Sequence, residues 1–314
     1  MEWAIHIAGA GEARTELCPE EIDRFEPGAA LRPTVRLAAK LIGEYFGPVR
    51  FTRCVYGNEF CEHLIPDREL LKQSLAAACE RGLRFTLLTP YVSDAGIDAL
   101  RPLLDLLDRE GDACEVVFND WGVLNLLRRD YPNLVPVQGR LMNKSLRDPR
   151  ITGVYGASDA PATTLVALRR SNLDCASYTE FLRRLGVEHV ELDNLPQGVD
   201  LSFVEGDIKT SLYMPFGFIS TSRICMAAGI HYSKRDKFQP GAPCHHECQA
   251  SLLKYTYTNS PFDNRDQGFY LKGNTYFYTH TEAMMRAVFE QSRAGLIHRL
   301  VFQPRLPMTW ERIS

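Results

Sequence analysis

Strand-like and helix-like segments alternate along the first 200 residues, and this alternation restricts the possible folds more than any other feature. Short β-branched or apolar runs, typical of buried strands, occur at 49–56, 83–92, 114–120, 133–139 and 189–194. Helical periodicity fills the segments between them, as in 96–111, where the leucines recur on one face. Repeated strand–helix units form parallel sheets covered by helices. At least five such units in 314 residues predict a single α/β domain, a closed or nearly closed (β/α) barrel.

The alternation weakens after residue 200. Strands are expected within LSFVEG, SLYMPFG and GFYLKGNTYFY, and a last strand is expected in HRLVFQP (298–304). Thr279 and Glu282 have the spacing of a capping box, which predicts that a helix starts there. Between the strands, residues 220–261 form a long irregular stretch that carries several cysteines. A loop of that length in a compact domain is usually functional or held in place by a ligand.

Composition narrows the setting. The N-terminal residues MEWAIHIAGAGEARTELCPEE lack the features of a signal peptide, and no apolar run is long enough for a membrane span, so a cytoplasmic location is expected. The formal net charge of -3 makes nucleic acid an unlikely partner. The basic segment GRLMNKSLRDPR (139–150) is therefore interpreted as a solvated loop. In a reducing compartment the nine cysteines should be free thiols, metal ligands or redox groups.

Three cysteines of the irregular stretch, Cys225, Cys244 and Cys248, form a C-x18-C-x3-C pattern. Thiolates bind zinc and iron–sulfur clusters well, and a four-ligand site needs one more group. Cys61 is the favoured fourth ligand, because it follows an early strand and should lie at the carboxyl rim of the barrel. Cys54 is the competing candidate, although it lies inside that strand. The other cysteines are expected to be packing residues: Cys18, Cys79, Cys114 and Cys175.

Two alternatives to a cluster remain open. His245 and His246 lie between Cys244 and Cys248, and imidazole is a common zinc ligand, so a Cys/His zinc site is one alternative. In the other, all nine cysteines are packing or incidental residues. The segment GAGEAR (9–14) begins like a dinucleotide-binding fingerprint, but Arg14 stands where the third glycine should be.

Polar residues that follow the predicted strands should line the rim, where (β/α) barrels carry their functional groups. Asp120 and Asp193 are the pocket candidates, and a helix-capping role is the alternative for Asp120. The neighbouring rim positions are Asn119, Gln138, Gly139 and Asn194.

Several segments resemble the collagenase-like peptidase family U32. SLYMPFGFISTSRICMAAG (211–229) is similar to the segment that leads into the cysteines of that family, and EVVFNDWGVLNLL (115–127) and VYGNEFC (55–61) are similar to two of its strand segments. The likeness covers short blocks of residues 49–314 and is greatest to the short UbiV-type members. Residues 1–48 do not resemble the start of those proteins and are interpreted as a divergent segment of the same domain.

The resemblance implies a barrel-like α/β protein that carries a 4Fe-4S cluster on Cys61, Cys225, Cys244 and Cys248. It also implies pairing with a related, UbiU-like subunit and a part in oxygen-independent hydroxylation during the biosynthesis of ubiquinone or another aromatic compound. Such a chain would be one subunit of a hydroxylase system that acts on a small aromatic substrate. Two other hypotheses are a peptidase-like or peptide-modifying protein with structural zinc or no metal, and a noncatalytic assembly subunit.

Overall fold

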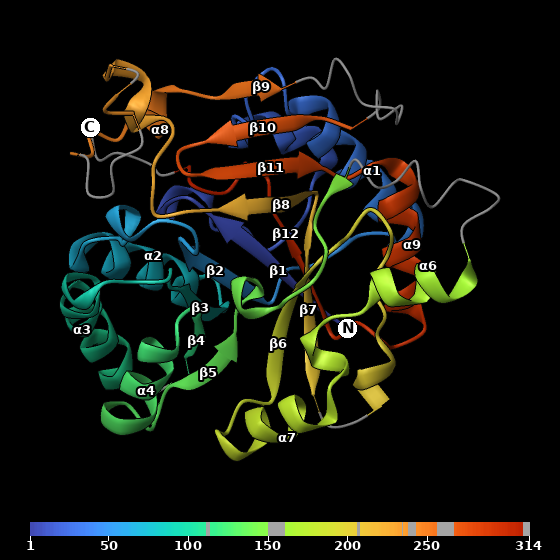
Figure 1. The fold of residues 1–314 in the computed structure, drawn as a ribbon, viewed down its shortest axis with the longest axis horizontal. Coiled ribbons are helices and arrows are strands. Elements are labelled where there is room, and N and C mark those ends of the chain that lie inside the picture. Colours follow the sequence, from blue (N-terminus) through green and yellow to red (C-terminus); the bar gives the residue numbers. More distant parts are fainter. Residues whose placement is uncertain are drawn as a thin grey trace.

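Eight parallel strands form a closed barrel in the order β1-β12-β7-β6-β5-β4-β3-β2 (Figure 1). The structure, a computed structural model, describes residues 1–110, 114–149, 161–205, 208–233, 235–237, 243–255 and 267–309. The predicted (β/α) barrel is confirmed. Its strands are β1 (Glu2–Ile7), β2 (Arg53–Gly57), β3 (Arg84–Leu88), β4 (Glu115–Phe118), β5 (Val135–Gln138), β6 (His189–Asp193), β7 (Lys209–Met214) and β12 (Arg299–Phe302).

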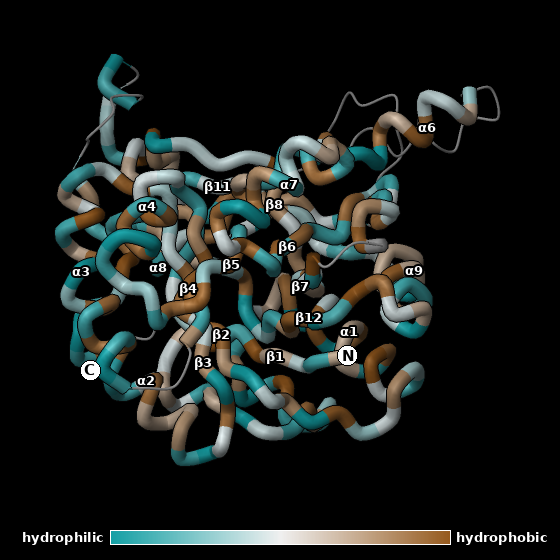
Figure 2. The backbone as a smooth tube through the Cα atoms, turned by 90° about the horizontal axis from the view of Figure 1, so that it is seen from below, coloured by the Kyte–Doolittle hydropathy of each residue, from teal (hydrophilic) through white to brown (hydrophobic). Residues whose placement is uncertain are grey.

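Helices surround the barrel and bury one apolar face each against it. In α3 (Asp94–Arg109) the predicted face is confirmed, since Leu100, Leu103, Leu104 and Leu107 are all buried. Among the described helices, α6 (Ala162–Arg169) differs, since it buries no side chain and projects from the body of the molecule (Figure 2). The other helices are α1 (Arg32–Phe46), α2 (Arg68–Glu80), α4 (Trp121–Asp130), α7 (Ala176–Arg184), the short α8 (Glu247–Ala250) and α9 (Glu282–Arg293).

A four-stranded antiparallel sheet lies across one end of the barrel (Figure 1). The ring of Phe60, from the loop after β2, packs at 5.2 Å from Phe277 and 5.3 Å from Phe218 of this sheet. The hydroxyl of Tyr278 donates to the backbone oxygen of Asn194, which follows β6, at 2.7 Å. The sheet therefore covers the carboxyl rim. Its strands, in order, are β8 (Phe216–Thr221), β11 (Thr275–Thr279), β10 (Phe269–Lys272) and β9 (Leu253–Tyr255).

The barrel interior has an apolar middle layer above a charged floor. Small and branched side chains fill the middle together with Tyr213: Ala4, Val55, Leu88, Val117, Val137 and Val301. At the amino ends of the strands Arg299 binds both oxygens of Glu115 at 2.7 and 2.8 Å, and Glu2 accepts from Arg53 and Arg299 at 2.8 Å each. Opposite charges thus close the floor in pairs, because an unpaired charge is costly to bury.

Two local predictions were wrong. The predicted strand LSFVEG is not a strand where it is described, because Ser202–Glu205 form a 3-10 turn, η7. The last helix is capped by Thr281, whose side chain accepts from the Met284 amide, whereas Thr279 is the final residue of β11. The described part of the stretch 220–261 is largely irregular, as predicted, and its short elements are η8 (Ala228–His231), α8 and β9.

Candidate metal centre

Cys61 lies in the loop after β2, just before the 3-10 turn η3 (Glu62–Leu64), at the carboxyl rim. The Asn58 side chain shapes this loop, because its Oδ1 accepts from the amides of Phe60 at 2.8 Å and Cys61 at 2.9 Å. Such a side chain-to-backbone turn holds the residue that follows a strand in one conformation. The Cys61 thiol is partly buried.

The three late cysteines lie on the segment that joins β8 to β9. Cys225 precedes η8, and its Sγ accepts from the Ala228 amide at 3.4 Å. Cys248 is buried in α8, and its Sγ accepts from the Gln249 side chain at 3.2 Å. Cys244 is partly buried just before this helix. Hydrogen bonds of this kind stabilise sulfur in its thiolate form, the form that binds metal.

The structure brings the four thiols into one neighbourhood. Burial is the main cause that raises the pKa of the Cys61 thiol to about 12; a hydrogen bond from the His63 backbone opposes it, and the nearby thiols of Cys225, Cys244 and Cys248 add to it. Burial likewise raises the pKa of Cys225 and of Cys248, each with the other late thiols as neighbours. In the part of the chain that the structure describes, no three His, Cys, Asp or Glu side chains are arranged to hold a metal ion. Four cysteine thiols are the type of ligand that a thiolate-bound metal or cluster needs. In this structure, however, they are not arranged as a complete metal site.

Glycine at position 273 lets the turn between β10 and β11 approach Cys248. Its φ of +61° lies in the left-handed region, and an added Cβ would be 3.2 Å from the Cβ of Cys248 and 2.5 Å from Cε of Met308. A side chain at position 273 would be strained in this conformation and would crowd both Met308 and Cys248.

Cys54 lies away from this neighbourhood. It is fully buried in β2, where burial raises the pKa of its thiol, and the charged groups that act on it are Glu12 and Arg81. Of the cysteines expected to pack in the core, Cys114 is buried, whereas Cys79 and Cys175 are exposed, contrary to the expectation. His245 is exposed, and His246 is half-buried at the left-handed start of α8.

A buried ion-pair cluster lies beneath the small sheet, and sequence reasoning missed it. Arg140 is fully buried and donates from Nε to Glu59 Oε2 at 2.9 Å and from Nη1 to Asp193 Oδ1 at 2.9 Å. Arg147 donates from Nε to Asp193 Oδ2 at 3.1 Å. Its guanidinium also packs at 4.4 Å from the Phe218 ring. The basic segment 139–150 is therefore not a solvated loop, because its two described arginines neutralise buried carboxylates.

Asp193, a predicted pocket residue, thus has both oxygens engaged by arginines. Below it, Glu191 accepts from the Tyr213 hydroxyl at 2.7 Å, and burial raises the pKa of Glu191 to about 8. The signal for this cluster was the segment HVELD, in which charged or polar residues alternate on one face of a strand that a barrel buries on both faces.

Asp120 caps α4. Its Oδ1 accepts from the Gly122 amide at 2.6 Å, and its Oδ2 accepts from the Val92 amide at 3.4 Å. Asn119 and Gln138, two further rim positions, are also engaged: Asn119 donates to the Thr89 backbone oxygen at 2.9 Å, and Gln138 accepts from the Tyr178 hydroxyl at 2.7 Å.

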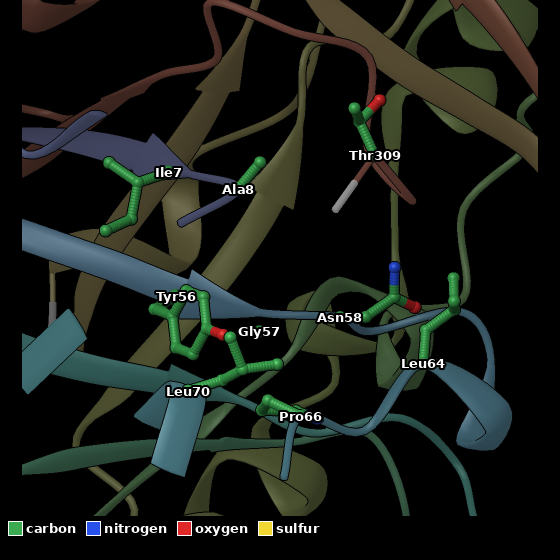
Figure 3. Close-up of a pocket in the computed structure, with 9 residues that line it drawn as sticks. All are labelled: Ile7, Ala8, Tyr56, Gly57, Asn58, Leu64, Pro66, Leu70 and Thr309. Atoms are coloured by element: carbon green, nitrogen blue, oxygen red, sulfur yellow. The ribbon is translucent and has the colours of Figure 1, made fainter. Parts of the chain in front are cut away.

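A small pocket lies at the carboxyl ends of β1 and β2, beside the turn that carries Cys61 (Figure 3). Its apolar walls include Ile7, Tyr56 and Leu64. The side-chain nitrogen of Asn58 points across the pocket toward Thr309 (Figure 3). A wider cleft, with an empty volume of about 1120 Å³ that includes open solvent, lies between 194–199 and α9. A ligand in the small pocket would contact the Asn58 turn, whereas one in the cleft would contact the end of β6.

Comparisons with known proteins give weak likenesses. No protein-family model matches the chain, and no curated protein matches its sequence. The solved structure of the U32 peptidase Mk0906 is 11% identical, with 96% of this chain and 92% of that chain covered and a TM-score of 0.39. A glycoside hydrolase family 18 N-acetylglucosaminidase from Paenibacillus barengoltzii is 10% identical, with 96% and 94% covered and a TM-score of 0.36.

A Group II chitinase catalytic domain from Ostrinia furnacalis is also 10% identical, with 96% of this chain and 89% of that chain covered and a TM-score of 0.36. Likenesses of this size assign neither a family nor an activity to the chain. No described helix has the length and apolar character needed to cross a membrane.

Proposed function

We propose that this chain is an iron–sulfur protein that holds a 4Fe-4S cluster on Cys61, Cys225, Cys244 and Cys248. In this proposal the chain resembles the UbiV-type members of the U32 family and acts together with a related, UbiU-like subunit. The pair would take part in the oxygen-independent hydroxylation of a small aromatic compound, such as a ubiquinone precursor. The sequence likeness of the SLYMPFGFISTSRICMAAG segment supports the family. Iron–sulfur clusters supply one-electron chemistry when bound.

One observation carries the proposal. Of nine cysteines spread over the chain, the four that share a neighbourhood come from the loop after β2 and from the segment between β8 and β9. Three of the four sulfurs accept N–H hydrogen bonds: Cys61 from the backbone of His63, Cys225 from Ala228 and Cys248 from Gln249. Hydrogen bonds to the sulfurs are one of the means by which proteins adjust cluster potentials. A set of packing cysteines requires neither feature.

Metal analysis of anaerobically purified protein tests the cofactor. We expect iron and acid-labile sulfide in about equal amounts, roughly four of each per chain, with broad visible absorption. Cys61→Ala, Cys225→Ala, Cys244→Ala and Cys248→Ala should each lower the iron content sharply. Cys54→Ala is the matched control, and it should keep the iron and cost about 1 kcal/mol of stability, since it removes only a small buried group.

Other outcomes separate the alternatives. Stoichiometric zinc without sulfide would replace the cluster with a structural zinc site, and His245→Ala and His246→Ala would then identify its remaining ligands. Iron lost from Cys54→Ala but kept in Cys61→Ala would reject the proposed ligand set.

Purification from the native source tests the partner. We expect a related, cysteine-bearing protein to copurify with this chain under anaerobic conditions. A monomer that carries out a complete reaction alone would reject the shared-function proposal. A stable pair that binds the cluster but shows no redox change with any aromatic substrate would favour the assembly-subunit hypothesis.

A further inference from the structure

We propose that Asn274 is the positioning residue that holds the cysteine-bearing segments together before any metal binds. This inference rests on the proposed function, because it concerns the same four thiols. Asn274 lies in the turn between β10 and β11 and is only 6% exposed. It is far in sequence from Cys61, and none of the motif patterns includes it.

The carboxamide of Asn274 links three separate parts of the chain. Its Nδ2 donates to the backbone oxygen of Phe60 at 2.7 Å and to the backbone oxygen of Ser222 at 2.7 Å, and it lies 3.1 Å from the hydroxyl of Tyr91. Phe60 directly precedes Cys61, and Ser222 lies three residues before Cys225. One buried side chain therefore connects the early and late cysteine segments.

The backbone of the same turn reaches the remaining segment. The Ser222 amide donates to the backbone oxygen of Asn274 at 3.3 Å, and the Ala227 amide donates to the backbone oxygen of Gly273 at 3.2 Å. Gly273 also packs closely against Cys248, since a Cβ at this glycine would lie 3.2 Å from the Cβ of Cys248. Residues 273 and 274 thus contact the segments of Cys61, Cys225 and Cys248.

The chemistry of the contact requires an amide. The Thr275 hydroxyl donates to Asn274 Oδ1 at 2.9 Å, which orients the group so that its NH2 faces the two carbonyl oxygens. Aspartate is nearly the same size but offers only acceptors at neutral pH, so it would place negative charge against two carbonyl oxygens beside four thiols. Leucine keeps the volume and leaves both buried carbonyls without their side-chain donor.

Iron retention and thiol proximity together test the inference. Asn274→Leu and Asn274→Asp should weaken iron retention by about 10- to 100-fold in the rate of loss to a chelator, the usual effect of losing a residue that orients metal ligands. The matched control is Asn119→Leu. Asn119 is also buried and also donates from its amide to a backbone oxygen, that of Thr89, but at another part of the rim. This variant should unfold more easily yet lose iron at the wild-type rate.

The metal-free protein gives a readout that does not depend on the cluster. A bifunctional thiol reagent, with the products mapped by mass spectrometry, should cross-link Cys61 to Cys225 or Cys248 in the wild type and in Asn119→Leu, and much less in Asn274→Leu. Wild-type protein that cross-links but never holds iron and sulfide would reject the proposed function and leave the positioning role standing. Asn274→Leu protein that cross-links and retains iron like the wild type would overturn the positioning role.

Discussion

At the scale of single residues, Arg140 ties together several side chains at the carboxyl end of the barrel. It neutralises Glu59 and Asp193, and its guanidinium lies 4.2 Å from the centre of the Tyr213 ring. These side chains come from four places in the barrel: Glu59 follows β2, Arg140 follows β5, Asp193 ends β6 and Tyr213 lies in β7. The arginine is therefore the group that allows two carboxylates to be buried under the small sheet.

Replacement of Arg140 by methionine should cost about 3–5 kcal/mol of unfolding free energy, because two buried carboxylates lose their main counter-charge. Urea unfolding followed by circular dichroism measures the loss. Arg129→Met is the control, because Arg129 pairs with Asp130 at the surface, and its unfolding midpoint should stay close to that of the wild type. Equal midpoints for the two variants would show that the buried cluster does not stabilise the fold.

Glu191 should make the protein less stable as the pH rises. Burial raises the pKa of Glu191 from 4.5 to about 8, so between these values the folded protein keeps a proton that the unfolded chain releases. The contribution of Glu191 to stability is therefore complete below about pH 4.5 and is lost as the pH rises to about 8. Glu191→Gln should remove this decline, as measured by urea midpoints across that range. A variant that follows the wild-type pH profile would contradict the prediction.

Among the elements, α4 depends on its first residue. Asp120 supplies the cap, and Asp120→Ala should cost about 1 kcal/mol of unfolding free energy, whereas Asp120→Asn should cost little because asparagine caps equally well. Urea unfolding of both variants measures these effects. If Asp120→Asn abolished function at wild-type stability, the carboxylate would have a role beyond capping.

The elements also show which parts of the fold were predictable. Local periodicity identified α3 and the strands from β2 to β6, because the order of apolar and polar residues within each segment determines which side chains it buries. The small sheet was harder to predict, since β8 pairs with β11 more than 50 residues later. The residue pattern of a strand does not indicate which distant strand it will pair with. Cys61 could be placed at the rim because it follows a strand. The segment HVELD indicated buried charge at Asp193, but its arginine partners could not be predicted, since Arg140 meets Asp193 from 53 residues away and Glu59 from 81 residues away.

For the whole molecule, the charged floor of the barrel should set the acid limit of stability. Burial alone would raise the pKa of Glu115, but Arg299 and Arg53 outweigh this effect and lower it from 4.5 to about 2. A lowered pKa contributes stability that is present above about pH 4.5 and is lost as the pH falls toward about 2. Glu115→Gln should therefore flatten the acid side of the stability profile, as measured by urea midpoints. If the urea midpoints of Glu115→Gln fell at low pH as they do in the wild type, other carboxylates would be responsible for acid unfolding.

The barrel is closed by its first and last strands. Residues Glu2 to Ile5 of β1 pair with Arg299 to Phe302 of β12, and the other edge of β1 pairs with β2. During translation β1 therefore has a neighbour on one edge only until residue 302 has left the ribosomal exit tunnel. All four clustered cysteines emerge before that point. The strand that closes the ring is therefore synthesised after every one of the clustered cysteines, so the β1–β12 pairing can form only once their segments are already in the solvent.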